Sequence, residues 1–127
     1  MDKPLEALAI QLRDFADRRD WQQFHSPKNL AMALSVEASE LLEHFQWLTQ
    51  EQSRLLDDEQ RIAVSEEIAD VLIYLVRLAD ILGIDPLEAV GRKMALNEEK
   101  YPVEQSRSIA VKYTRLGKRQ PCSSEDQ

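Results

Sequence analysis

Two short acidic signatures, each set in an apolar helical stretch, constrain this chain more than any other feature of its sequence. The first pairs Glu37 with Glu40, and the second pairs Glu67 with Asp70. Residues three apart lie on one face of a helix, so each signature places two carboxylates side by side. Two like charges about 4 Å apart repel by on the order of 4 kcal/mol at an effective dielectric constant near 20. A fold that brings both pairs together therefore needs a cation.

Both acidic pairs are expected to face the protein interior. On a helical wheel, Glu37 falls at the edge of an apolar stripe that includes Leu34 and Leu41, and the second pair shares a face with Tyr74. A solvated surface is the ordinary explanation for such acidic residues, but charges are almost never buried unless they are paired or bound to metal. Carboxylates suit Mg²⁺, with Mn²⁺ as the alternative ion, whereas zinc or copper requires clustered His or Cys. We therefore predict a magnesium site.

The composition narrows the class of protein. The chain has 127 residues, which is enough for one domain whose core needs no disulfides. Asp and Glu outnumber Lys and Arg by 23 to 16, and the net charge of −7 argues against nucleic acid as a partner. Cys122 is the single cysteine, the N-terminus does not resemble a signal peptide, and no apolar run could cross a membrane. We expect a cytoplasmic protein with no membrane partner.

Helical periodicity runs through the chain and alternating strand patterns are missing, so we predict an all-α fold. Ser26 followed by Pro27 predicts the start of a helix, as does Asp85 followed by Pro86. Gly83 predicts a helix end. The predicted helices are residues 4–19, 27–48, 58–82 and 86–100, with at most one helical turn in the connection 49–59.

The third predicted helix is apolar around nearly its whole circumference. Ile68 and Leu72 lie away from the face that carries Glu67. A chain of this length can hardly surround such a helix, so we expect part of its surface to meet another subunit. Residues 1–104 are predicted to form the helical domain and residues 105–127 a C-terminal tail that is partly disordered.

A family resemblance is carried by four segments, which are Trp21–Leu30, Glu40–Trp47, Asp70–Leu75 and Lys93–Val103. Together with the two acidic pairs, they resemble the MazG-like nucleoside triphosphate pyrophosphohydrolases, and within them the dCTP pyrophosphatase branch. The resemblance implies a four-helix MazG-like bundle that oligomerisation completes, with a homotetramer as the expected assembly. It also implies Mg²⁺-dependent hydrolysis of a (deoxy)nucleoside triphosphate, dCTP or a modified dCTP, to the monophosphate and pyrophosphate.

The resemblance also assigns roles to individual residues. The implied metal ligands are Glu37, Glu40, Glu67 and Asp70. The implied substrate-binding residues are Trp21, His25, Trp47, Tyr74, Lys93, Asn97, Lys100 and Tyr101. A carboxylate that is not fully used as a ligand can take the proton of the attacking water, and we expect either Glu37 or Glu40 to act as this catalytic base.

Trp47 is expected to stack on the base of the nucleotide. Because the second helix is predicted to reach Leu48, Trp47 would lie on nearly the same helix face as Glu37, about 15 Å further along the axis. Without the resemblance, packing in the core would be an equal alternative for this residue.

Three other interpretations stay open at this point. One is a pyrophosphohydrolase of broader or dUTP-like specificity. Another is a carboxylate-bridged di-iron bundle, but its Glu-x-x-His motif is missing, because Leu41 stands three residues before His44 and Gln22 three before His25. The last is a non-enzymatic helical interaction protein, in which the acidic pairs are only a charged surface.

Overall fold

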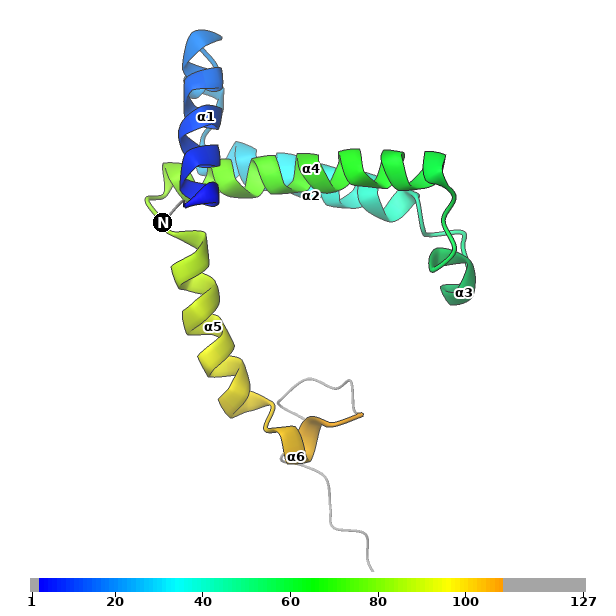
Figure 1. The fold of residues 1–127 in the computed structure, drawn as a ribbon. Helices are drawn as coiled ribbons and strands as arrows, with labels where there is room; N and C mark the ends of the chain where they lie inside the picture. Colours follow the sequence, from blue (N-terminus) through cyan, green and yellow to red (C-terminus); the bar gives the residue numbers. More distant parts are fainter. Residues whose placement is uncertain (1–2, 109–127) are drawn as a thin grey trace, which may run out of the picture. The chain divides into compact units, whose positions relative to one another are not determined.

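The computed structural model describes residues 3–108, and every regular element in this range is helical, so the all-α prediction is confirmed. The chain divides into two compact units, Met1–Asp85 and Pro86–Gln127, and each is described by itself. No helix among the described residues is long and apolar enough to cross a membrane. The predicted tail, with Cys122, lies outside the described residues from position 109 onward. The elements in Figure 1 are α1 (Pro4–Arg18), the 3₁₀ helix η1 (Gln22–Phe24), α2 (Pro27–Glu43), α3 (Gln50–Ser53), α4 (Asp58–Ile81), α5 (Pro86–Lys100) and α6 (Val103–Ser106).

Local capping interactions set the start of α2 and the end of α4. The Ser26 side chain accepts a hydrogen bond from the Asn29 N–H at 3.1 Å, and proline occupies the first helical position. Gly83 follows α4 with φ of 66°, and the Ile84 N–H donates to the Ala79 carbonyl at 2.8 Å. This is a Schellman motif, in which glycine adopts the left-handed conformation without steric cost. Both predicted helix boundaries are confirmed.

The end of α2 differs from the prediction. The helix ends at Glu43, so its predicted extension to Leu48 is wrong. The following backbone hydrogen bonds close shorter turns, such as that from the Phe45 N–H to the Leu42 carbonyl at 2.9 Å. Thr49 then caps α3 with a ψ of 164°, and the chain must leave the helical conformation before that cap. As expected, α3 is a single helical turn in the connection.

The packing of the first unit is centred on α4. In Figure 1, α2 runs alongside α4, while α1 crosses the part of α4 near its C-terminus. The buried apolar residues among those described are Ala16, Leu30, Val76 and Ala79. Several large apolar side chains of α4 are nevertheless exposed, and they are Ile62, Ile68, Leu72, Ile73 and Leu75.

A left-handed turn after α1 directs the chain back toward α4. Asp20 has φ of 54°, and the Trp21 N–H donates to the Ala16 carbonyl at 3.0 Å, which repeats the Schellman pattern. Aspartate enters this conformation more readily than most non-glycine residues. The chain continues through η1 to His25, whose ring accepts a hydrogen bond from Arg77 of α4. This turn therefore positions the segment that precedes α2.

Candidate active site

Carboxylates from two helices converge between α2 and α4. Glu37 of α2 and Glu67 and Asp70 of α4 each place one oxygen within 4.8 Å of the others, and all three side chains are half-buried. The side-by-side packing of the two helices brings these groups together. Glu40, the fourth predicted ligand, is also half-buried but lies outside this group of three.

Two oxygen atoms of this carboxylate group have no hydrogen-bond partner among the described residues. They are Oε2 of Glu37 and Oε2 of Glu67, and both are buried. A buried polar atom without a partner costs free energy, and a buried charge costs more. The pKa of Glu37 is raised to about 7, first by burial and then by neighbouring carboxylates, of which Glu40 has the largest effect. The site therefore needs positive charge.

The donor atoms fit a hard divalent cation. Glu37, Glu67 and Asp70 offer only oxygen, which is the ligand type that Mg²⁺ and Mn²⁺ prefer. Nearby, Nε2 of His44 lies 3.6 Å from Oε1 of Glu67. Sequence reasoning gave His44 no role, although its position seven residues after Glu37, two helical turns, could have indicated it. We infer that the three carboxylates would hold the ion.

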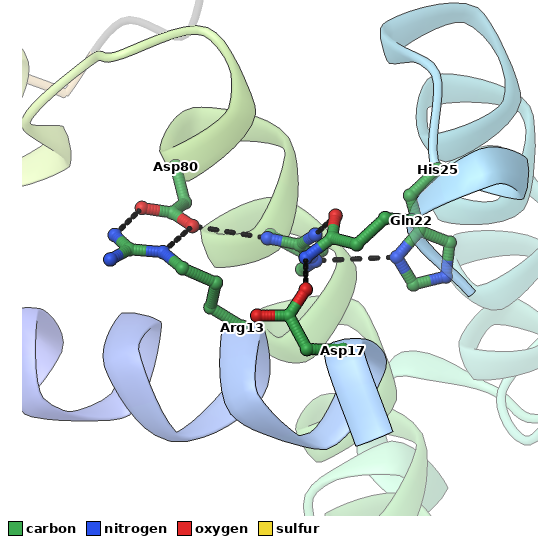
Figure 2. A network of polar contacts seen from close by, with 6 residues as sticks. Arg13, Asp17, Gln22, His25 and Asp80 are labelled. Carbon is green, nitrogen blue, oxygen red and sulfur yellow. Dashed lines mark hydrogen bonds and ion pairs between the residues drawn. The ribbon is translucent and has the colours of Figure 1, made fainter. Parts of the chain in front are cut away.

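A buried arginine lies two helical turns beyond Asp70 on the same side of α4. Arg77 is 3% exposed, and Figure 2 shows the polar contacts around it. Its Nη1 donates to Oδ2 of Asp80 at 3.0 Å, and its Nη2 donates to Oε1 of Gln22. Its Nε donates to Nδ1 of His25 at 3.2 Å. One side chain of α4 thus fixes two residues of the segment that precedes α2.

The polar network extends on both sides of Arg77. Gln22 donates its Nε2 to Oδ1 of Asp17 at 2.7 Å. Asp80 accepts hydrogen bonds from Nε of Arg13 at 3.0 Å and from Nη2 of Arg13 at 2.6 Å. The hydrogen bond from Arg13 is the main reason that the pKa of Asp80 lies below its ordinary value. A carboxylate therefore compensates the buried charge of Arg77.

Sequence reasoning missed Arg77, but the sequence contains a signal for it. The residue is the cation that interrupts an apolar run beginning at Val71. It also follows Tyr74 by three positions and Asp70 by seven, which places all three on one side of the helix. A charge on that inward face needs a buried partner.

His25 borders an open pocket of about 480 Å³ beside the Arg77 network. The centroids of the His25 and Trp21 rings are 6.3 Å apart, and Tyr74 lies between Asp70 and Arg77 along α4. Three predicted substrate-binding residues therefore lie on the same side of the carboxylate group. The residues that line the pocket are Arg13, Gln22, His25, Arg77, Asp80 and Ile81.

Trp47 lies beyond the opposite end of α2 from His25. Its predicted position on that helix, in line with Glu37, is wrong because α2 ends at Glu43. The side chain is 87% exposed, so it does not belong to the core of this chain. α2 has 17 residues and a length of about 25 Å. A single chain therefore does not bring Trp47 and His25 to the same base.

The remaining predicted substrate-binding residues belong to the second unit. Lys93, Asn97 and Lys100 lie on one face of α5, whose predicted bounds are confirmed. Tyr101 follows directly, and its N–H donates to the Asn97 carbonyl at 2.8 Å. Asn97, Lys100 and Tyr101 are half-buried, while Lys93 is exposed.

The chain is similar in sequence and in fold to known proteins. The sequence profile of the MazG-like family matches residues 32–116, so the chain belongs to that family, as its segments predicted. It is 48% identical over 105 residues to dCTP pyrophosphatase 1 of Mus musculus and 46% identical to that of Homo sapiens. Each match covers 81% of this chain and 62% of the relative's length. The crystal structure of a pyrophosphatase from Archaeoglobus fulgidus is 48% identical, with a TM-score of 0.76 over 80% of this chain and 95% of that one.

Proposed function

We propose that this chain hydrolyses a (deoxy)nucleoside triphosphate, dCTP or a modified dCTP, to the monophosphate and pyrophosphate, with Mg²⁺ or Mn²⁺ as cofactor. One observation carries the proposal. Glu37, Glu67 and Asp70 converge, and two of their buried oxygens have no hydrogen-bond partner within residues 3–108. In a MazG-like chain similar to dCTP pyrophosphatases, this arrangement supports metal-assisted opening of a phosphate anhydride.

The reaction requires a nucleophilic water and neutralisation of the phosphate charge. Bound Mg²⁺ supplies that neutralisation. Glu40 is our candidate for the catalytic base, because it lies beside Glu37 but outside the group of three carboxylates. It would take a proton as the water oxygen bonds to phosphorus, while the bond between the α and β phosphates breaks and pyrophosphate leaves.

The remaining residues would bind the two ends of the substrate. Trp21, His25 and Tyr74 lie along one side of the carboxylate group and would contact the nucleoside. Lys93 and Lys100 of α5 carry charges that suit phosphate oxygens. Asn97 and Tyr101 are linked by a backbone hydrogen bond and would contact the substrate beside these two lysines.

We also propose that the protein works as a homo-oligomer, with a tetramer as the expected form. α4 exposes large apolar side chains, among them Ile62 and Ile68. Trp47 and His25 lie at opposite ends of α2, so a second protomer would be needed to place both rings at one nucleoside. Oligomerisation would complete the four-helix bundle and cover these apolar side chains.

Pyrophosphate release from a panel of triphosphates, measured with Mg²⁺ and with EDTA, tests the function. We expect the fastest release with dCTP or a modified dCTP and none with EDTA. Equal rates with dUTP and other triphosphates would favour the enzyme of broader specificity. No release from any triphosphate, together with no heat of Mg²⁺ binding in calorimetry, would favour the interaction protein.

A further inference from the structure

In the hydrogen bond between Arg77 and His25, only Arg77 can be the donor. The guanidinium group of arginine carries five N–H donors and no acceptor, and it stays protonated in proteins. Its Nε lies 3.2 Å from Nδ1 of His25, so that nitrogen must be the unprotonated acceptor. A neutral imidazole protonated on one nitrogen then carries its hydrogen on Nε2.

The position of Arg77 is itself determined by its neighbours. Gln22 donates its amide nitrogen to Asp17, and this leaves the amide oxygen to face Arg77. Asp80 accepts a hydrogen bond from Nη1 of Arg77 at 3.0 Å and compensates the charge of the guanidinium group. Each guanidinium nitrogen thus has one acceptor, and the Nε position is left for His25. Such a side chain has little freedom to turn away from the imidazole.

The second ring nitrogen of His25 is available to a ligand. Figure 2 shows it on the side of the ring away from the network, and Nε2 has no hydrogen-bond partner among residues 3–108. Arg77 lies seven residues beyond Asp70 on the same side of α4, so about 10 Å of helix separates Arg77, the partner of His25, from the carboxylates. That spacing suits a nucleoside whose phosphates reach the acidic group.

We propose that Arg77 is a positioning residue that holds His25 in the Nε2–H form, so that His25 donates a hydrogen bond to an acceptor atom of the nucleoside. This inference rests on the proposed function for the identity of the ligand. Burial, and then the charge of Arg77, lower the pKa of His25, which agrees with a neutral ring. A donor at this point favours a ring nitrogen or carbonyl acceptor, such as N3 or O2 of cytosine, over an N–H group.

A simpler role is that Arg77 only ties α4 to residues 22–25. The two roles differ in what the imidazole does when Arg77 is replaced. A structural tie affects stability, whereas a positioning role changes the proton distribution of His25 and the affinity for substrate. Arg13 provides the matched control, because it shares Asp80 with Arg77 but donates no hydrogen bond to His25 in the described part of the chain.

Nitrogen NMR of the imidazole tests the tautomer in the protein without substrate, and so does not depend on the enzymatic proposal. The chain has two histidines, so a His25→Gln sample identifies the signals of each. We expect the Nε2–H form alone in the wild type and in Arg13→Met, and a mixture of tautomers or a charged ring in Arg77→Met. Arg77→Lys replaces the methionine variant if that variant does not fold. It keeps the charge but has a single nitrogen for three acceptors, so we expect the same mixture of tautomers. A predominant Nδ1–H form in the wild type, or an unchanged tautomer in the folded Arg77 variant, overturns the proposal.

Kinetics with dCTP test whether Arg77 acts through His25. We expect Arg77→Met to raise KM by about threefold to tenfold, the value of one hydrogen bond, with a smaller change in kcat. In the His25→Ala background, the same substitution should raise KM no further, because residues that act as one unit are not additive. Full additivity of the two effects, at matched folded fractions, overturns the proposal. Failure to hydrolyse any triphosphate would overturn the proposed function, and with it the nucleoside as ligand, while the NMR result would still decide the tautomer.

Discussion

Arg13 of α1 and Asp80 of α4 form a two-point ion pair, with Nε to Oδ2 at 3.0 Å and Nη2 to Oδ1 at 2.6 Å, across 67 positions of sequence. Asp80 also accepts a hydrogen bond from Arg77 at 3.0 Å. One carboxylate therefore pairs with a cation that is half exposed and with another that is buried. The two pairings differ in their energetic importance because their exposure to water differs.

The first prediction compares these two pairings. Asp80→Asn should lower the free energy of unfolding by about 3 kcal/mol, because it leaves the buried charge of Arg77 uncompensated. Arg13→Met should cost less than about 1 kcal/mol, as solvated ion pairs do. Urea denaturation at pH 7 and fixed protein concentration measures both. Because folding lowers the pKa of Asp80, its contribution is present above pH 3.8 and is lost as the pH falls through the folded pKa. Equal losses in the two variants would contradict the prediction.

The second prediction concerns pH and Glu37 in the metal-free protein. Its pKa is raised from 4.5 to about 7 by folding, so the folded state binds the extra proton between these values. In EDTA, the contribution of Glu37 to the stability of the protein should therefore be greatest below pH 4.5 and should fall as the pH rises toward 7. Glu37→Gln should flatten that part of the melting-temperature profile. Glu43→Gln, an exposed substitution on the same helix, should leave the profile unchanged.

The third prediction concerns Asp70. Asp70→Asn should abolish pyrophosphate release, because it removes one carboxylate of the converging group. Without Mg²⁺ the variant should be as stable as the wild type or more so, since a repulsive charge is gone. Glu66→Gln changes an exposed acid on the same helix and should keep full activity. An active Asp70→Asn enzyme would refute the metal assignment.

The fourth prediction concerns Trp47. Stacking on an aromatic ring contributes roughly 1–3 kcal/mol per base, so Trp47→Ala should raise KM about tenfold or more with a smaller loss in kcat. Because the side chain is 87% exposed, the melting temperature of a single protomer has little reason to change. Leu55→Ala, another exposed apolar residue of the same connection, is the control. An unchanged KM would place the base elsewhere.

The last prediction concerns assembly. Light scattering at micromolar concentration should give a homo-oligomer, with a tetramer as the expected mass. Ile68→Lys on the exposed face of α4 should shift the mass toward smaller species, because a buried unpaired charge is costly. Ile10→Lys, on the exposed side of α1, provides a comparison outside that face. A stable wild-type monomer would contradict the oligomer.

Several features of this structure depend only on residues close together in the sequence, and these features were predictable. The pair Ser26 and Pro27 predicted where α2 begins, and Gly83 predicted where α4 ends, because capping depends on a few adjacent residues. The three-residue spacing of Glu67 and Asp70 likewise predicted a shared inward face. The end of α2 was harder to predict, since it depends on competition with the Thr49 cap that follows.

Only the tertiary structure decided which distant residues meet. The register of α2 against α4 selects Glu37, Glu67 and Asp70 for one group and leaves Glu40 at its side. The crossing of α1 brings Arg13 to Asp80 and so completes the network around Arg77. These contacts join residues that lie tens of positions apart, and helical periodicity carries no information on how one helix is offset against another. The sequence by itself therefore determined the helices and their inward faces, and packing determined the site between them.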